Sequence, residues 1–195
     1  MPLPKTSTDD PRADLLAKLE RYLLRYPQEK ETIEAFALFV HSNPQCFERS
    51  LLEGHVCGSA WVVNKEGSAV LLTHHKKIGR WLQLGGHADG DSDILHVALR
   101  EAQEESGLSE IAPLSTEIFD ISIHTISARG AEPEHKHYDV RFTFQTDATK
   151  PLSVSDESHA LRWVELSELD RLATDPSVLN MRRKWLLARP LWPLH

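Results

Sequence analysis

The stretch at residues 93–108, DILHVALREAQEESGL, limits the possible folds of this chain more than any other segment. An aspartate suited to capping a helix precedes apolar residues at helical spacing, and Gly107 suits the left-handed position that ends a helix. The pattern therefore predicts one well-defined helix. Its last turns carry Glu101, Glu104 and Glu105, at the end where the helix dipole opposes negative charge.

These three carboxylates need compensation. Like charges three or four residues apart cost roughly 0.2–0.5 kcal/mol per pair, and a carboxylate near a helix C-terminus costs roughly 0.3–1 kcal/mol. At about 100° per residue the glutamates form one stripe, and an apolar stripe lies roughly perpendicular to it. The apolar stripe consists of Leu95, Ala98, Leu99 and Ala102. A solvated surface helix can absorb the cost, whereas a bound divalent cation would reverse its sign, so the pattern is typical of an exposed acidic face or of a hard-cation site.

The composition is that of one globular domain with, at most, a small extension. The chain has 195 residues, of which 41% are hydrophobic and 26% charged. A net charge of −7 argues against nucleic-acid binding, which favours a basic surface. Residues 1–16 lack the apolar core of a signal peptide, and no apolar run is long enough to span a membrane. Cys46 and Cys57 form no Cys-x-x-Cys pair, so we expect reduced thiols in a cytoplasmic protein that binds neither nucleic acid nor membrane.

The hydrophobic periodicity changes near residue 54, which predicts two parts. Residues 1–50 contain helical spacing over 13–26 and 30–41, and we expect them to form an N-terminal helical extension. In residues 51–195 strand-like segments are interleaved with helices, which indicates an α/β or α+β sandwich. The predicted strands lie at 58–64, 68–75, 80–86, 117–129, 137–146 and 161–166, and the helices of this part at 93–108, 166–173 and 177–189.

The longer stretch at residues 86–108 resembles the Nudix box. That box reads Gly, five residues, Glu, seven residues, then Arg-Glu-apolar-x-Glu-Glu-x-Gly-apolar. Gly86 opens the stretch, and the positions that fall in register are Arg100, Glu101, Ala102, Glu104, Glu105, Gly107 and Leu108. The resemblance implies a Nudix-type α/β/α sandwich with a mixed sheet over roughly residues 54–190.

The chain departs from the box at its first glutamate, where Ser92 stands. In the family this glutamate usually pairs with the box arginine, so Arg100 needs another partner. We expect that partner to be Asp91.

The resemblance also implies an activity, the metal-dependent hydrolysis of a phosphoanhydride bond in a small molecule. The substrate would be a nucleoside diphosphate linked to another group. Mg²⁺ or Mn²⁺ would be held by Glu104 and Glu105, with Glu101 as a further ligand or base. A cation suits the reaction because it neutralises phosphate charge and lowers the pKa of the attacking water. In the family a glutamate before the last strand often acts as base or ligand, so Glu157 completes the expected catalytic set.

Histidines on the predicted strand at 137–146 and just before it form a second candidate site. His135, His137 and Asp139 alternate, so an extended backbone puts them on one face, opposite an aromatic one. A polar face in solvent is the common explanation, but this spacing can also chelate a transition metal or contact phosphate. The WLQ-GGH stretch and the His-x-His-x-Asp strand are similar to those of a Nudix subgroup. The candidate metal set is His124, His135, His137 and Asp139, and the candidate substrate-binding set is Arg80, His87, His137 and Arg141.

Two other functions remain open at this point. One is a Nudix-like module that binds a nucleotide without turning it over, which Ser92 favours and the intact glutamates disfavour. The other is an isomerase acting on a prenyl diphosphate, since such relatives surround a metal with histidines and glutamates. Those enzymes usually carry a cysteine nucleophile, for which Cys57 is the candidate. Whether the protein is a homodimer is also left open.

Overall fold

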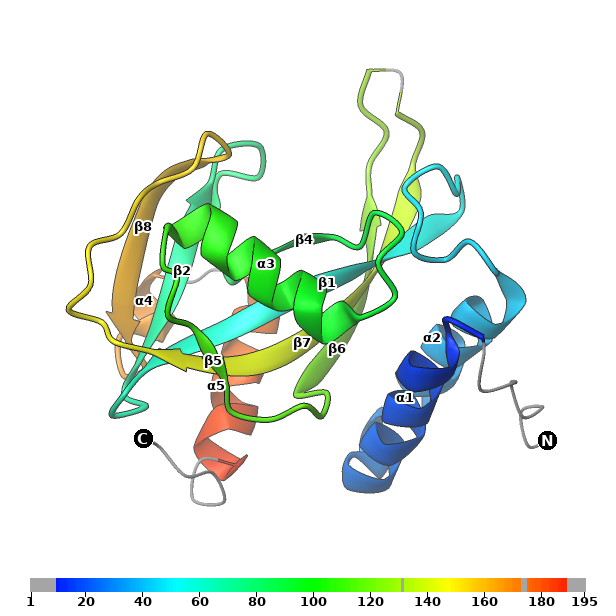
Figure 1. Cartoon of the computed structure of the whole chain (residues 1–195), viewed down its shortest axis with the longest axis horizontal. Helices are drawn as coiled ribbons and strands as arrows, with labels where there is room; N and C mark the ends of the chain where they lie inside the picture. The colour runs from blue at the N-terminus through cyan, green and yellow to red at the C-terminus, as the bar shows by residue number, and fades with distance from the viewer. Residues whose placement is uncertain (1–9, 131, 173–174, 189–195) are drawn as a thin grey trace.

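The computed structural model describes residues 10–130, 132–172 and 175–188. Over these residues the chain forms one eight-stranded mixed sheet with five α-helices around it, so the predicted α+β sandwich is confirmed (Figure 1). The strands are β1 (Gly54–Asn64), β2 (Ala69–His75), β3 (Arg80–Leu82), β4 (Leu84–His87), β5 (Ala112–Pro113), β6 (Asp120–Ile126), β7 (His135–Thr146) and β8 (Ser158–Glu165). The helices are α1 (Ala13–Arg25), α2 (Lys30–Ser42), α3 (Ile94–Ser106), α4 (Leu169–Leu172) and α5 (Pro176–Ala188), with a 3₁₀ turn η1 (Pro27–Glu29). Residues 173 and 189, the predicted ends of two helices, lie outside the described ranges.

The ends of α3 follow the predicted capping. The Asp93 side chain accepts a hydrogen bond from the backbone N–H of His96 at 3.1 Å, and Gly107 adopts a left-handed φ of 73°. The short elements η1 and β5 contain too few residues to produce a periodic pattern, and the sequence did not predict them. No helix in the described part of the chain combines the length and the apolar character needed to cross a membrane.

β1 is the central strand of the sheet. It pairs in parallel with β7 along its whole length, from Gly54 beside Lys136 to Asn64 beside Thr146. On its other side it pairs antiparallel with β4 near its start and with β2 near its end. Strand β2 extends the sheet to β3 and β8, and β7 extends it to β5 and β6. Side chains of β4, β1 and β7 therefore lie next to one another at one end of the sheet.

The two faces of the sheet differ in character, as the alternation in β7 predicts. One face carries the larger apolar core, which includes Val140 and Phe142 and is covered by α3. Gly58 of β1 allows α3 to lie close, since an added Cβ would be 2.9 Å from a methyl carbon of Val97. The opposite face carries polar side chains near β4 and a second core beneath α5 that includes Trp61 and Trp185.

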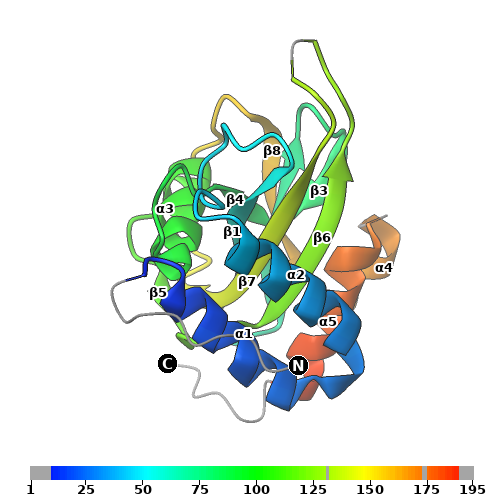
Figure 2. The ribbon, with the colours of Figure 1, turned by 90° about the vertical axis from the view of Figure 1, so that its right-hand side faces the viewer.

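Helices α1 and α2 cover the side of the sheet formed by β6 and β7, between α3 and α5 (Figure 2). The ring of Tyr138 on β7 stacks on Phe39 of α2 with centroids 3.7 Å apart, and Phe36 meets it edge-on at 5.3 Å. These helices therefore share the larger core with α3. The domain boundary at residue 50 stays a prediction.

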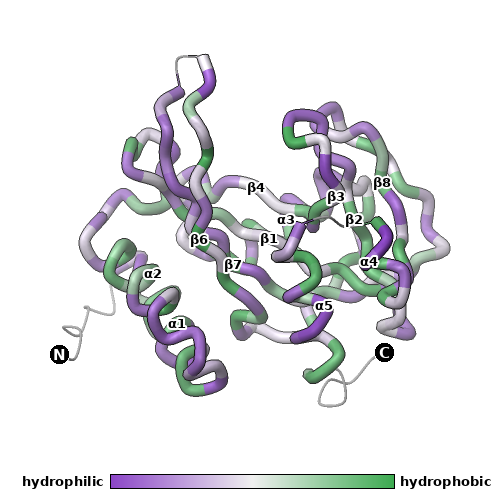
Figure 3. Tube along the Cα trace, turned by 180° about the vertical axis from the view of Figure 1, so that it is seen from behind, coloured by the Kyte–Doolittle hydropathy of each residue, from purple (hydrophilic) through white to green (hydrophobic). Residues whose placement is uncertain are grey.

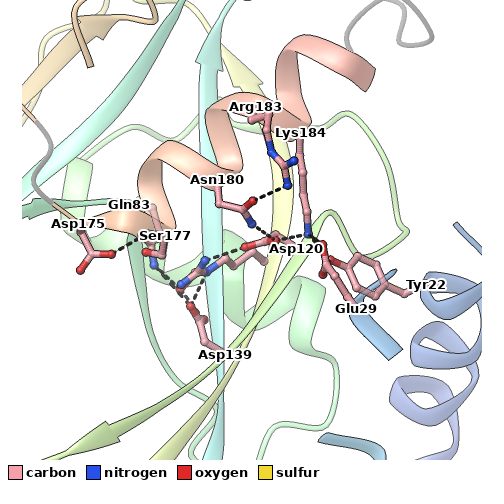
Figure 4. Close-up of polar contacts among 12 residues, drawn as sticks. Tyr22, Glu29, Gln83, Asp120, Asp139, Asp175, Ser177, Asn180, Arg183 and Lys184 are labelled. Atoms are coloured by element: carbon pink, nitrogen blue, oxygen red, sulfur yellow. Dashed lines mark hydrogen bonds and ion pairs between the residues drawn. The ribbon is translucent and has the colours of Figure 1, made fainter. Parts of the chain in front are cut away.

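A buried ionic network joins α5 to the sheet and to α1 (Figure 4). The ammonium of Lys184, a residue that is 3% exposed, donates to the carboxylate of Asp120 and to the hydroxyl of Tyr22, and it lies 2.6 Å from a carboxylate oxygen of Glu29. Asp120 also accepts from Arg141 Nη1 at 2.7 Å. Because buried charges are tolerated only when paired, this network fixes how α5 lies on the sheet.

Candidate functional site

The three glutamates of α3 lie beside β4 in three different environments. Glu105 is 6% exposed and accepts a hydrogen bond from the Gly85 N–H at 2.9 Å. Glu101 lies directly against Gly86, where an added Cβ would be 2.3 Å from a carboxylate oxygen of Glu101. The Glu104 side chain is 61% exposed. The stripe therefore runs from the sheet into solvent, and its carboxylates do not converge on one point.

Burial controls the proton affinity of the inner glutamates. It raises the pKa of Glu105 to about 7, although the hydrogen bond from Gly85 lowers this pKa. The negative charges of Glu101 and Glu157 raise it further. Burial also raises the pKa of Glu101, with Arg100 acting in the opposite direction. Both carboxylates have lost much of the water that normally stabilises their charge, so each favours a nearby cation or a proton.

Helix α3 is rotated relative to the orientation that the sequence predicts. Its buried residues are Ile94, Val97, Ala98, Ala102, Glu105 and Ser106. Leu95 and Leu99 of the predicted apolar stripe are only partly buried and pack against the edge of the core. The close approach of the helix to Gly58 favours the smaller side chains at the contact, and this rotation turns Glu105 toward the sheet.

Arg100 does not pair with Asp91, so that prediction is wrong. Its Nη1 lies 2.8 Å from Glu101 and 3.5 Å from Glu104, and its Nη2 donates to the backbone carbonyl of His87 at 3.1 Å. Asp91 instead lies 2.7 Å from the ring of His96. The box arginine thus occupies part of the space between the carboxylates that were expected to hold a cation.

Two further predicted residues are exposed near the start of their strands. Glu157 lies in the turn before β8, and its charge raises the pKa of both Glu101 and Glu105. Arg80 begins β3, and its guanidinium is 3.8 Å from the carboxylate of Asp175. The catalytic role of Glu157 and the substrate-binding role of Arg80 stay predictions.

Arg141 and Asp139 are engaged with partners inside the protein. Arg141 is 3% exposed, and it donates through Nε to Asp139 and through Nη1 to Asp120, each at 2.7 Å. Asp139 also accepts from the Ser59 hydroxyl at 2.7 Å. Each of the two charges therefore already has a buried partner, and the expected substrate-binding role of Arg141 and metal-binding role of Asp139 stay predictions.

Three imidazoles and one thiol converge on the face of the sheet opposite α3. This histidine–cysteine cluster comprises His55 and Cys57 from β1, His87 from β4 and His137 from β7. One candidate ligand atom from each residue lies within 4.8 Å of the others. Among the described residues, no other group of three or more histidine, cysteine and acidic side chains converges in this way.

The cluster differs from the predicted metal set, of which it keeps only His137. His135 contacts the cluster from outside, with its Nε2 at 3.2 Å from Nε2 of His137. His124 is exposed, and its ring centroid lies 5.4 Å from that of His137. Sequence reasoning did not assign His55 and Cys57 to a metal site because the predicted strand began at residue 58, four residues after the observed start of β1 at Gly54. The alternation of these two residues would have placed them on one face.

The arrangement of a glycine-containing strand, a glutamate-bearing helix and a mixed sheet agrees with one known family. A family model described as the NUDIX domain matches residues 55–184. The chain belongs to the Nudix family. The predicted enzyme class, a Nudix pyrophosphohydrolase, is thereby confirmed.

Solved Nudix structures share this fold at low sequence identity. A MutT protein from Methanosarcina mazei Go1 is 18% identical, with a TM-score of 0.57 over 71% of this chain and 97% of its own. The Nudix hydrolase RenU from M. smegmatis is 20% identical, with a TM-score of 0.54 over 73% of this chain and 90% of its own. An Ap4A hydrolase from C. elegans, in a binary complex, is 18% identical, with a TM-score of 0.51 over 68% and 95%. These likenesses concern the fold alone, and no curated protein matches the chain significantly in sequence.

Proposed function

We propose that this Nudix protein hydrolyses a phosphoanhydride bond in a nucleoside diphosphate linked to another group, with Mg²⁺ or Mn²⁺ held by the glutamates of α3. The observation that carries the proposal is the position of Glu101 and Glu105. Both lie against the Gly85–Gly86 backbone with their pKa values raised by burial, and Glu104 stands beside them in solvent. Carboxylates that have lost their water are stabilised by a divalent cation bound nearby.

The residues present fit such a cation. Carboxylate oxygens are the ligands that Mg²⁺ and Mn²⁺ prefer, and Gly86 leaves room for the Glu101 carboxylate that any side chain there would displace. When bound, the cation would neutralise charge on the phosphoanhydride and lower the pKa of the attacking water. The carboxylates of Glu101 and Glu104 both form ion pairs with Arg100. A substrate phosphate would give the Arg100 guanidinium a new acceptor and leave these carboxylates free for the cation.

Glu157 is the proposed general base. It is exposed, its charge raises the pKa of Glu105, and an exposed carboxylate can take a proton from the attacking water. Arg80 is the proposed phosphate contact among the predicted substrate-binding residues, because its side chain is 53% exposed. His87 and His137 belong to the histidine–cysteine cluster, and Arg141 is enclosed.

A hydrolysis panel tests the proposal. The purified full chain is incubated with ADP-ribose, NADH, a dinucleoside polyphosphate and nucleoside triphosphates, each with Mg²⁺, with Mn²⁺ and with EDTA, and products are separated by chromatography. The dinucleoside polyphosphate is included because the C. elegans structure of this fold is an Ap4A hydrolase. We expect cation-dependent cleavage of at least one nucleoside diphosphate derivative.

Matched variants distinguish this site from others. Glu104→Gln should lose more than ~100-fold in turnover because a charged ligand is removed from an exposed position without disturbing the core. Glu31→Gln, an exposed carboxylate on α2, should retain wild-type turnover. Cleavage that persists in EDTA, or that is equal in the two variants, would overturn the metal-dependent mechanism.

A further inference from the structure

We propose that the histidine–cysteine cluster binds one transition-metal ion, Zn²⁺ in the first instance, at a site separate from the glutamates of α3. The metal would have a structural role, because it would hold β1, β4 and β7 together. It does not depend on the substrate or the metal proposed for hydrolysis.

The register of the sheet brings the four residues together. His55 of β1 lies beside His137 of β7, and Cys57 of β1 lies opposite His87 of β4. His55 and Cys57 are two residues apart on one strand, so their side chains point to the same face. Figure 3 shows this side of the sheet, with β7 and β4 on either side of β1. Three paired strands thus fix the backbone of every candidate ligand.

His55 is the second observation that points to a ligand. It is 2% exposed, and neither of its ring nitrogens has a hydrogen-bond partner among the described residues. A neutral imidazole always carries one N–H donor and one lone pair, and buried polar groups are nearly always satisfied. A metal ion bound by the lone pair would give the His55 ring the partner that the surrounding described residues do not supply.

The donor set favours zinc. Three imidazole nitrogens and one thiolate form a tetrahedral set of the kind that zinc adopts, whereas Mg²⁺ prefers oxygen. Zinc–nitrogen and zinc–sulfur bonds of roughly 2.0 and 2.3 Å put ligand atoms roughly 3.3–3.6 Å apart. The observed atoms lie within 4.8 Å of one another, so side-chain shifts of about 1 Å would close the site. Cys57 would bind as the thiolate and release its proton to solvent.

The geometry of β4 separates this site from the glutamate stripe. Gly86 faces Glu101 on the α3 side, and the next residue, His87, therefore points to the opposite face. Four protein ligands leave no open position on a tetrahedral ion, as is usual for a structural zinc. By holding His87, the ion would keep the Gly85–Gly86 backbone in place against Glu101 and Glu105.

Metal content and cobalt spectroscopy test the proposal. The full chain is expressed with added zinc, passed over a chelating resin to remove loosely bound metal, and analysed by elemental mass spectrometry. Bound zinc is then removed with a strong chelator, and the resulting apoprotein is titrated with Co²⁺. We expect about one zinc per chain, and a cobalt spectrum with tetrahedral visible bands and a thiolate charge-transfer band in the near ultraviolet. Cys57→Ala and His55→Leu should bind zinc more than ~10-fold more weakly.

Two controls make the result specific. His96→Gln changes an exposed histidine of α3 and should keep the zinc, as should Glu104→Gln, which alters only the glutamate stripe. If Cys57→Ala fails to fold, the cobalt charge-transfer band of the wild type still reports thiolate ligation. Wild-type protein without tightly bound metal and without that band overturns the proposal, as does zinc that is lost in Glu104→Gln or kept in both cluster variants.

Discussion

Replacing Glu105 by glutamine should stabilise the metal-free protein, although the residue belongs to the proposed active site. Burial raises the pKa of Glu105 from an ordinary value of 4.5 to about 7 in the folded state. The folded chain therefore binds this proton more tightly than the unfolded chain does. Stability linked to Glu105 is fully present below pH 4.5, is lost as the pH rises through about 7, and stays lost above it.

The size of the effect follows from the same two pKa values. The rise of the Glu105 pKa from 4.5 to about 7 corresponds to ~3 kcal/mol of unfolding free energy at pH 8. Glutamine has nearly the same shape, carries no charge and can still accept the hydrogen bond from Gly85. In EDTA the Glu105→Gln variant should thus exceed the wild type by ~3 kcal/mol at pH 8, or roughly 6–12 °C in melting temperature, and equal it at pH 4.

Urea denaturation of both proteins between pH 4 and pH 8 measures this difference. The buried histidines titrate in both proteins and cancel when one curve is subtracted from the other. Glu104→Gln is the matched control, since its exposed carboxylate should change stability by less than ~0.5 kcal/mol. A difference that does not vary with pH, or a variant less stable than the wild type at pH 8, would refute the reasoning.

Three other predictions concern packing, the buried ions and the box arginine. Gly58→Ala should lose ~1–3 kcal/mol in guanidinium denaturation, because the added carbon would lie within 3.0 Å of α3, and an unchanged midpoint would contradict this. Lys184→Met should lose ~3–5 kcal/mol in the same assay, because it removes a cation that Asp120 contacts in the interior; a loss below ~1 kcal/mol would show that Asp120 is satisfied without it. Ser92→Glu should pair with Arg100 and so draw it away from the α3 glutamates. The affinity for Mn²⁺ in calorimetry should then rise about fivefold, or ~1 kcal/mol, and Mn²⁺ binding no tighter than that of the wild type would contradict this.

The sequence predicted those parts of the fold that depend on neighbouring residues. Helix α3 begins after Asp93 and ends before Gly107 as expected, because capping and glycine conformation are local properties. The alternation in β7 likewise gave its two faces correctly. Which side of α3 enters the core was not predictable, since the contact with Gly58 of a distant strand decides it and turns Glu105 inward.

The composition of the histidine–cysteine cluster lay beyond local reasoning for a similar reason. His135, His137 and Asp139 are close in sequence, and their spacing alone suggested a shared site. In the fold, Asp139 pairs with Arg141, and the neighbours of His137 come from β1 and β4. Charge pairing and strand register, which depend on residues far apart in the chain, determine both outcomes.

The parallel pairing of β1 with β7 has a consequence for synthesis in the cell. The two strands are about 80 residues apart in sequence, so β1 leaves the ribosome long before its partner exists. At roughly 5–20 residues per second, the apolar segment of β1 that contains Val62 and Val63 waits on the order of 4–16 seconds with one edge unpaired. An unpaired apolar strand is a template for association with other chains. The central position that organises the finished sheet thus makes β1 a segment of the nascent chain that a chaperone would protect from association.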